Sequence, residues 1–419
     1  MQVKTGKRLV LGAAAAIVLI AAGAVVWWLF PGLRPGTVEY AHTWPGRARE
    51  GFAVSRVTVA ALSDGADRLL AQGGEWASWH RIAGKGGVPP AETSPFTSTA
   101  DQVLRLRHAV ESDDRGEASD LIDFLARERM DMEGRLLEAD GLPVRNLIAL
   151  DAVRALAEAY TAWGVRSWSD IAVRISGSLL DGGGRLGVPS DSNVALPGPT
   201  PTPVTLTTPT PGPGGTATPV PTTTAASERP LRPYCALAGL DVYTMQLMSK
   251  ADAEWESART AALEAIRTAY IGDALPLYLA GADPDTGLPV PYAGDEPVVD
   301  TLDSLLVILH LCEAGEQRAE SIAWIRAALY NDGALRSSYD IVTGEPHDTA
   351  ENPAAYAVVA RIARILDDSE LYRLATERLA WHIADLRSSA AYGTVFRETA
   401  DGRIEVRAYD NAWALLGMG

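Results

Sequence analysis

The sequence predicts an all-α fold in which helical hairpins close into an α/α toroid. The first observation is that apolar residues recur at helical spacing along most of the chain. The second is that these segments come in pairs, each joined by a short turn that contains Asp or Gly. The third is that strand-like alternation is scarce, with "GTVFRE" (393–398) as the best example. A chain of 419 residues, 47% of them hydrophobic, can bury the large core that this fold needs.

The expected helices follow one another in order. A weaker segment covers 56–72, and a last helix begins near residue 408. Between them lie the pairs 101–111 with 115–130, 147–163 with 165–180, 238–249 with 252–270, 300–314 with 317–330, and 353–366 with 369–386. Successive hairpins are typical of a solenoid, a bundle or a closed toroid. No short sequence repeat is visible, which disfavours the solenoid.

The N-terminus predicts a membrane anchor. Residues 9–30, "LVLGAAAAIVLIAAGAVVWWLF", carry no charge and are long enough to cross a bilayer as a helix. Residues 1–8 hold Lys4, Lys7 and Arg8, which are expected on the cytoplasmic side. We therefore interpret 9–30 as an uncleaved transmembrane signal-anchor, with a single-pass topology and the large domain extracytoplasmic. A cleaved signal peptide is the alternative.

A second non-globular segment interrupts the helices. Residues 195–230 alternate proline with threonine, a composition that favours polyproline II and forms no packed core. Such a tract is also suited to O-glycosylation outside the cell. Helical pairs on both sides favour one toroid, made of 38–194 and 231–419, with this disordered tract as an insertion. Two unrelated bundles joined by a linker are the alternative.

Charge and motif content exclude several classes of function. A net charge of −16 without a basic run argues against nucleic acid. The chain has no phosphate-binding loop, no Gly-x-Ser-x-Gly elbow and no His-Glu-x-x-His, so we expect neither a cofactor nor a metal. The only cysteines, Cys235 and Cys312, would form either one disulfide or two buried thiols.

Several segments resemble glycoside hydrolase family 8, of the six-hairpin glycosidase superfamily. They include "FTSTADQVLRLRHAVESDDRGEASDLIDFL" (96–125), "VRNLIALDAVRALAEAYTAWG" (144–164), "LRPYCALAGLDVYTMQLMSKADAEW" (231–255), "VVDTLDSLLVILHLCEAGE" (298–316) and "YDNAWALLGM" (409–418). The C-terminal half is most similar to the bacterial membrane-linked branch associated with exopolysaccharides. The resemblance implies an (α/α)6 toroid, a β-1,4-linked glycan as substrate, and inverting hydrolysis by two carboxyl groups.

The position that the resemblance assigns to the catalytic acid holds Ala100. The family's motif there is similar to Thr-Ser-Glu-Gly-Gln, and aligning on Gln102 places Ala100 at the Glu. Asp101 lies one residue further, about 100° around a helix axis. Asp101 is either a displaced acid or the third residue of a capping box that begins at Ser98. Hydrolysis by the family's mechanism is therefore doubtful.

The base position is better preserved. The resemblance implies a catalytic Asp at the start of an inner helix, and "VVDTLDSLL" places Asp300 there, with Asp303 one turn later on the same face. The alternative is that Asp300 only caps the helix. In the second segment, the spacing of Asp151 and Arg154 predicts an ion pair on a helix surface.

Aromatic side chains and one further carboxylate complete the expected site. Glu351, before "NPAAY", is the best remaining acid that could line a cleft. Rings expected in turns or at helix ends, where they could stack on sugars, are Trp44, Trp76, Trp79, Tyr234, Tyr339, Tyr392 and Tyr409. Rings expected in the core are Trp163, Trp255, Trp324 and Trp381. Asp410 and Asn411 are expected to cap the last inner helix.

The sequence thus favours a membrane-anchored protein similar to glycosidases, which acts on or binds an exopolysaccharide or cell-envelope glycan. Its partners would be the membrane and a polysaccharide or oligosaccharide. One alternative is a glycan-binding pseudoenzyme without turnover. The other is a scaffold that holds a polysaccharide-synthesis complex together at the membrane.

Overall fold

The computed structural model describes residues 52, 54, 56–181, 186, 193–195, 231–292, 296–399 and 401–419. The signal-anchor predicted at 9–30, the ring of Trp44 and nearly all of the 195–230 tract lie outside these residues. Within them, no helix combines the length and apolar character that crossing a membrane requires.

Twelve α-helices form within the described residues, close to the predicted ranges. They are α2 (Arg56–Leu70), α3 (Thr99–Glu111), α4 (Arg115–Glu128), α5 (Asn146–Trp163), α6 (Arg166–Gly177), α7 (Val242–Met248), α8 (Glu254–Thr268), α9 (Thr301–Ala314), α10 (Ala319–Ala327), α11 (Pro353–Ile365), α12 (Ser369–Ala380) and α13 (Ala408–Met418). A π-helical turn at Ala328–Asp332 and short 3-10 turns at Lys85–Gly87 and Leu237–Gly239 join them.

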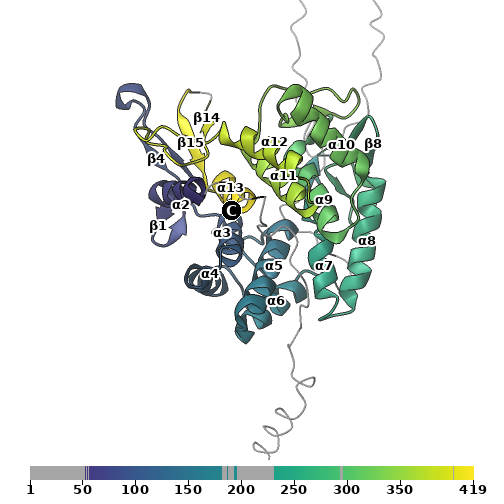
Figure 1. The fold of residues 1–419 in the computed structure, drawn as a ribbon. Coiled ribbons are helices and arrows are strands. Elements are labelled where there is room, and N and C mark those ends of the chain that lie inside the picture. The colour runs from purple at the N-terminus through teal and green to yellow at the C-terminus, as the bar shows by residue number, and fades with distance from the viewer. Residues whose placement is uncertain are drawn as a thin grey trace, which may run out of the picture.

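The helices form two concentric rings. The inner ring consists of α3, α5, α7, α9, α11 and α13; each packs against the next, and α13 packs against α3 to close the ring. The outer helices α4, α6, α8, α10 and α12 each follow an inner helix, and α2 packs on α13. Figure 1 shows the inner helices around a common centre and the outer ones around them. Helices from both sides of the 195–230 tract therefore share one ring.

Local signals explain where the helices begin and end. The side chain of Asp114 caps α4 by accepting from the Glu117 N–H, and Asp368 caps α12 in the same way through Leu371. Gly164 and Gly315 take the left-handed conformation that ends α5 and α9. The inner helices α5, α9 and α13 are buried on nearly every side, because the core and the outer helices enclose them.

The strands are short and lie in the connections. One antiparallel sheet has the order β14 (Arg397–Glu398), β15 (Ile404–Arg407), β3 (Trp79–Arg81), β4 (Glu92–Thr93). A second has the order β11 (Pro289–Val290), β10 (Gly281–Ala282), β7 (Cys235–Ala236). Two-stranded pairs are β1 (Ala71–Gln72) with β2 (Glu75–Trp76), β5 (Asn193–Ala195) with β6 (Leu231–Pro233), β8 (Tyr270–Gly272) with β9 (Leu275–Tyr278), and β12 (Val298–Asp300) with β13 (Ser338–Asp340). Most have only two or three residues, too few for a period-two pattern to reveal them.

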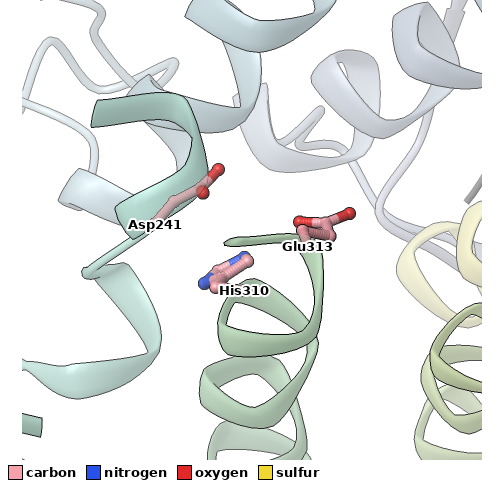
Figure 2. A group of neighbouring side chains, drawn as sticks. All are labelled: Asp241, His310 and Glu313. Carbon is pink, nitrogen blue, oxygen red and sulfur yellow. The ribbon is translucent and has the colours of Figure 1, made fainter. Parts of the chain in front are cut away.

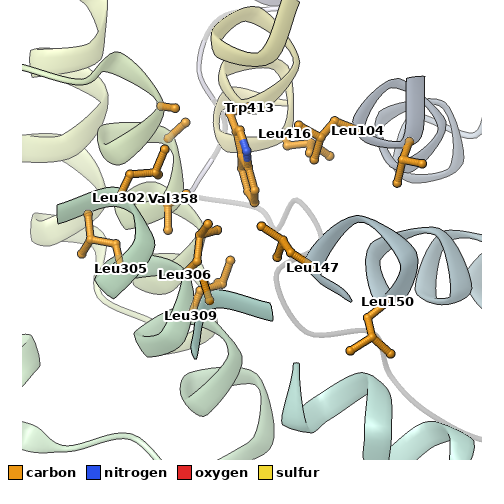
Figure 3. Packing of buried hydrophobic residues seen from close by; sticks show 14 of the residues in the cluster. Leu104, Leu147, Leu150, Leu302, Leu305, Leu306, Leu309, Val358, Trp413 and Leu416 are labelled. Carbon is orange, nitrogen blue, oxygen red and sulfur yellow. The ribbon is translucent and has the colours of Figure 1, made fainter. Parts of the chain in front are cut away.

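The inner helices meet in an apolar core. Figure 3 shows Leu302, Leu305, Leu306 and Leu309 of α9 facing residues from the other inner helices, among them Leu147, Leu150, Val358, Trp413 and Leu416. Trp255 is buried as expected, at 1% exposure. Trp381, which was also expected in the core, is 75% exposed because α12 ends just before it.

Buried ion pairs join the inner helices near the ring axis. Arg107 of α3 contacts Asp151 of α5 at 2.5 Å, and Arg154 of α5 contacts Glu313 of α9 at 2.6 Å. All four side chains are buried. The surface ion pair predicted between Asp151 and Arg154 is therefore wrong: both side chains point into the ring and pair with other helices. Both cysteines are free thiols and buried.

Candidate active site

The start of α9 holds the carboxylate pair expected from the sequence. Asp300 is the last residue of β12 and the N-cap of α9, where its carboxylate accepts a hydrogen bond from the backbone N–H of Asp303 at 2.9 Å. The pairing of β12 with β13 places Asp300 opposite Ser338. The next residue is anchored as well, since the Thr301 hydroxyl donates to the Arg336 carbonyl at 2.6 Å. Asp300 therefore is an N-cap, and its position is rigidly defined.

The two carboxyl groups influence each other electrostatically. Burial raises the pKa of Asp303 to about 6, and the negative charge of Asp300 adds to this rise. Desolvation also raises the pKa of Asp300, although its side chain is exposed. A carboxyl group with a pKa near 6 is suited to accept a proton at neutral pH.

Two cations and a phenol face this pair. Arg145, which precedes α5, lowers the pKa of Asp303, and Arg397 of β14 lowers that of Asp300. Tyr409 of α13 lies close enough for the charge of Asp303 to raise the pKa of its hydroxyl, after the larger effect of burial. Residues from α5, α9, α13 and the β14–β15 sheet thus converge where inner helices begin.

Arg397 connects the pair to the start of α13. Its guanidinium contacts both carboxylate oxygens of Asp410, at 2.5 and 2.6 Å, and donates to the Asn352 side chain at 2.6 Å. Asn411 exchanges hydrogen bonds with the backbone of Val395. Asp410 and Asn411 were expected to cap α13; instead Arg407 is the N-cap residue and makes no side-chain bond. Their role is to fix the β14 segment and Arg397 beside the site.

Asp101 lies in the first turn of α3 and is buried, with 3% of its surface exposed. Burial raises its pKa well above the usual value for Asp, and the nearby carboxylates of Glu138 and Asp410 act in the same direction. A hydrogen bond with Ser78 opposes this rise. Burial therefore favours the protonated form of Asp101, which is the form that a general acid needs.

The start of α3 is capped in a way that the sequence did not reveal. Ser98 is the N-cap, as expected, and accepts from the Ala100 N–H at 3.1 Å. The neighbouring N–H, that of Thr99, donates to Glu138 at 2.9 Å. Glu138 belongs to the loop between α4 and α5, so no local pattern could identify it. A carboxylate from another loop thus binds the residue before Ala100.

The expected aromatic residues divide into buried and accessible rings. Trp76 is 2% exposed and donates to Asp67, and Tyr339 is 5% exposed and packs edge-on against Trp324. These two rings belong to the core, so their predicted role in binding sugar is not supported. Rings that remain partly exposed are Trp79, Tyr234, Tyr392 and Tyr409. Trp79 pairs across the sheet with Arg407, the residue before α13, and so lies at the same end of the ring as Asp300.

Glu351 is held in an ion-pair network. Its carboxylate accepts from Tyr356 at 2.5 Å and from Arg378 at 2.8 Å, and it lies 3.4 Å from Arg336. These partners lower its pKa to about 2, against the opposing effect of burial. With its oxygens occupied by three partners, Glu351 joins α11 to α12 and to the loop before α11. Its predicted role as a cleft-lining acid is not supported.

Comparisons with known proteins show which solved structures have a similar fold. No family model and no curated protein matches this chain. Among solved structures, the chain is similar to an α-amylase from Clostridium perfringens, with 21% identity and a TM-score of 0.68 over 86% of this chain and 96% of that one. PssZ from Listeria monocytogenes gives 13% identity and a TM-score of 0.57, over 90% and 97% of the two chains.

A reducing-end-xylose-releasing exo-oligoxylanase, in a mutant form complexed with xylobiose, gives 15% identity and a TM-score of 0.53, over 88% and 93% of the two chains. These likenesses extend over most of every chain compared. They show that this chain has the six-hairpin (α/α)6 fold.

Proposed function

We propose that this protein binds a polysaccharide and hydrolyses it at the end of the ring where the inner helices begin. The observation that carries the proposal is the Asp300–Asp303 pair, in which Asp303 has a pKa of about 6. A base in inverting hydrolysis must be ionised to activate water, yet basic enough to take its proton. Asp303 meets both conditions near neutral pH.

The remaining side chains take supporting roles. Asp101, whose protonated form burial favours, is the group in this region best suited to donate a proton to the leaving oxygen. Asp300 raises the basicity of Asp303 through its charge. Burial raises the pKa of Asp300, and Arg397, held by Asp410, opposes this rise.

The substrate class is proposed from the fold and the site together. Two of the similar proteins are named as an α-amylase and an exo-oligoxylanase, and both names denote enzymes that act on glycans. We favour a β-1,4-linked exopolysaccharide or cell-envelope glycan, as the resemblance to the membrane-linked branch of glycoside hydrolase family 8 implies. A signal-anchor at 9–30 would place the domain outside the membrane, where such polymers occur.

The proposal is tested with the full chain purified in detergent and incubated with cello-, xylo-, chito- and malto-oligosaccharides. Release of reducing ends is measured for the native chain and for Asp303→Asn. We expect this substitution to lower kcat by about 10²–10⁴-fold, the usual value of general acid–base catalysis. Asp123→Asn is the matched control, since Asp123 is exposed on the outer helix α4 and pairs only with Arg127 there. Equal turnover by the native chain and Asp303→Asn would refute the assignment.

A second function rests on two observations. Ala100 stands where the family resemblance expects the acid, and the neighbouring Asp101 is almost inaccessible. These two facts favour a protein that binds glycan without cleaving it. Saturable oligosaccharide binding with no release of reducing ends would identify this function. Absence of both binding and turnover would instead favour a scaffold for polysaccharide synthesis.

A further inference from the structure

A second group of polar side chains lies inside the ring, separate from the Asp300–Asp303 pair. Asp241 is the N-cap of α7, and His310 and Glu313 lie one turn apart on α9. One ligand-type atom from each of the three residues lies within 4.8 Å of those of the other two. Figure 2 shows the three side chains arranged around a common gap. All three residues are buried.

Two of these residues have buried atoms without a hydrogen-bond partner. The Glu313 side chain is fully buried, and its Oε1 lacks a partner, while Oε2 accepts from Arg154 at 2.6 Å. His310 is 1% exposed, and its Nδ1 also lacks a partner. Leaving a buried polar atom unpaired costs about 1–3 kcal/mol. Two such atoms beside one gap therefore indicate a missing ligand.

Carboxylates crowd around one guanidinium at this group. Among the described residues, Arg154 pairs with Glu158 and Glu313 and also faces the carboxylate of Asp241. Of the neighbouring guanidiniums, Arg107 pairs with Asp151 and Arg361 with Glu111, while Arg364 donates to backbone carbonyls. Buried carboxylates need a cation or hydrogen-bond donors close by.

We propose that Asp241, His310 and Glu313 bind one divalent transition-metal ion, of the zinc or manganese class. Two carboxylate oxygens and one imidazole nitrogen form a donor set typical of these ions, whereas calcium and magnesium take oxygen alone. The ion offsets the negative charge of the two carboxylates and provides the missing partner for Glu313. Arg154, bound to the other oxygen of Glu313, and Thr244, bound to Asp241, orient the two carboxylates.

The position of the ion gives it a structural role. It joins α7 to α9, two adjacent helices of the inner ring, and α7 is the shortest helix among the described residues. Because the site is buried, the ion enters while the chain folds, and its binding energy contributes to folding. No metal was expected from the sequence, because two ligands come from α9 and the third from a distant segment, without a recognisable spacing.

The experiment is metal analysis of the full chain, purified in detergent without a chelator. We expect roughly one equivalent of zinc, manganese or iron per chain, as for other structural metal sites. His310→Gln should lose this metal, because the amide is a poor ligand for these ions. Glu158→Gln is the matched control: it removes a carboxylate bound to Arg154 but none of the proposed ligands, and it should keep the metal.

Thermal unfolding provides a second readout. Refolding the native chain with zinc should raise its Tm relative to refolding with a chelator, whereas His310→Gln should show the same Tm in both. A metal-free native chain whose Tm does not respond to zinc or manganese would overturn the proposal. Metal retained by a folded His310→Gln variant would also overturn it, because the ion would then be bound elsewhere. None of these outcomes depends on glycan turnover.

Discussion

The carboxylate of Asp300 accepts the backbone N–H of Asp303 at 2.9 Å, which fixes two acidic side chains one above the other in the first turn of α9. A helix N-terminus stabilises negative charge, so this site tolerates two carboxylates. Their mutual repulsion nevertheless raises the pKa of Asp303 to about 6, after the larger effect of burial. Capping and charge repulsion thus arise from the same pair of residues.

Asp300→Asn should shift the pH dependence of the reaction. Asn is also a good N-cap, so α9 keeps its start while the charge disappears. Without the charge of Asp300, the pKa of Asp303 falls below about 6. The acidic limb of the kcat–pH profile should therefore move to lower pH, and rates near pH 7 should fall as Asp303 becomes a weaker base.

A profile measured on the oligosaccharide that the native chain cleaves best tests this expectation. Asp123→Asn, on the outer helix α4, should leave the limb unchanged. An acidic limb that stays in place in Asp300→Asn would show that another group acts as the base.

Asp303→Asn should stabilise the protein at neutral pH. The folded state raises the pKa of Asp303 from 3.8 to about 6, so the folded state binds more protons than the unfolded state between these values. The contribution of Asp303 to the free energy of unfolding therefore falls as pH rises from about 4 to 6. Removing the carboxyl group removes a penalty of up to about 3 kcal/mol at pH 7.5 and almost none at pH 4.

Urea unfolding of both proteins at pH 4 and at pH 7.5 measures this difference. A gain of equal size at both pH values would indicate that the side chain's packing, and not its ionisation, is responsible.

Glu351→Gln should destabilise the protein at neutral pH and have little effect at low pH. The pKa of Glu351 is lowered from 4.5 to about 2, so its stabilising effect is complete above pH 4.5 and is lost as pH falls towards 2. At pH 7 we expect a loss of about 3 kcal/mol of unfolding free energy, because Arg378 and Arg336 lose the charge that pairs with them.

Glu370→Gln serves as the control, since Glu370 pairs with Arg373 on the exposed side of α12. That change should cost little, because water and salt screen an exposed ion pair. Chemical unfolding at pH 7 and at pH 3 compares the two variants. An equal loss for both at pH 7 would show that the Glu351 network contributes no more than a surface pair.

Gly417→Ala should weaken the contact between α13 and α11. A Cβ at this position would lie 2.8 Å from the Cα and carbonyl oxygen of Ala357, closer than packed atoms allow. Since both atoms belong to the backbone of an inner helix, the helices must move apart. We expect a loss of roughly 1–3 kcal/mol of unfolding free energy, as for other overpacked cores.

Gly177→Ala, at the end of α6, tests the same change in open space, because nothing lies within 4 Å of its added Cβ. It should be neutral or stabilise by up to about 1 kcal/mol. Comparing the Tm of the two variants separates crowding from the general effect of removing a glycine. A Gly417→Ala protein as stable as the native chain would show that the crossing can widen freely.

The helices could be predicted from the sequence because their signals are local. Apolar spacing identified each helix, and Ser98 and Asp300 were recognised as helix starts from the residues that follow them. The predictions that failed concerned side chains whose contact partners lie far away in the sequence. Asp151 and Arg154 have the spacing of a surface pair, yet each is buried by a partner on another inner helix.

The same limit applies to the candidate site. Trp381 is exposed and Trp76 is buried because of where the neighbouring helices and strands end. The sequence around a single Trp does not indicate this. Glu138 binds the Thr99 N–H from the next loop, and Arg397 pairs with Asp410 from another element. The acidic pair of α9 could be recognised in the sequence. The cations that lower the pKa values of this pair come from other parts of the chain.

The contact between α13 and α3 also determines the order of events during synthesis. Roughly 300 residues separate the end of α3 from the start of α13, and ribosomes add about 5–20 residues per second. Arg107 of α3 packs against Trp413 of α13 in the folded protein. The ribosome therefore needs roughly 15–60 seconds after it has made α3 to complete this contact partner. During that interval the nascent chain exposes the face of α3 that α13 will later cover. Chaperones bind exposed surfaces of this kind. Slow closure of this kind makes the yield of folded protein sensitive to translation rate and to chaperone supply.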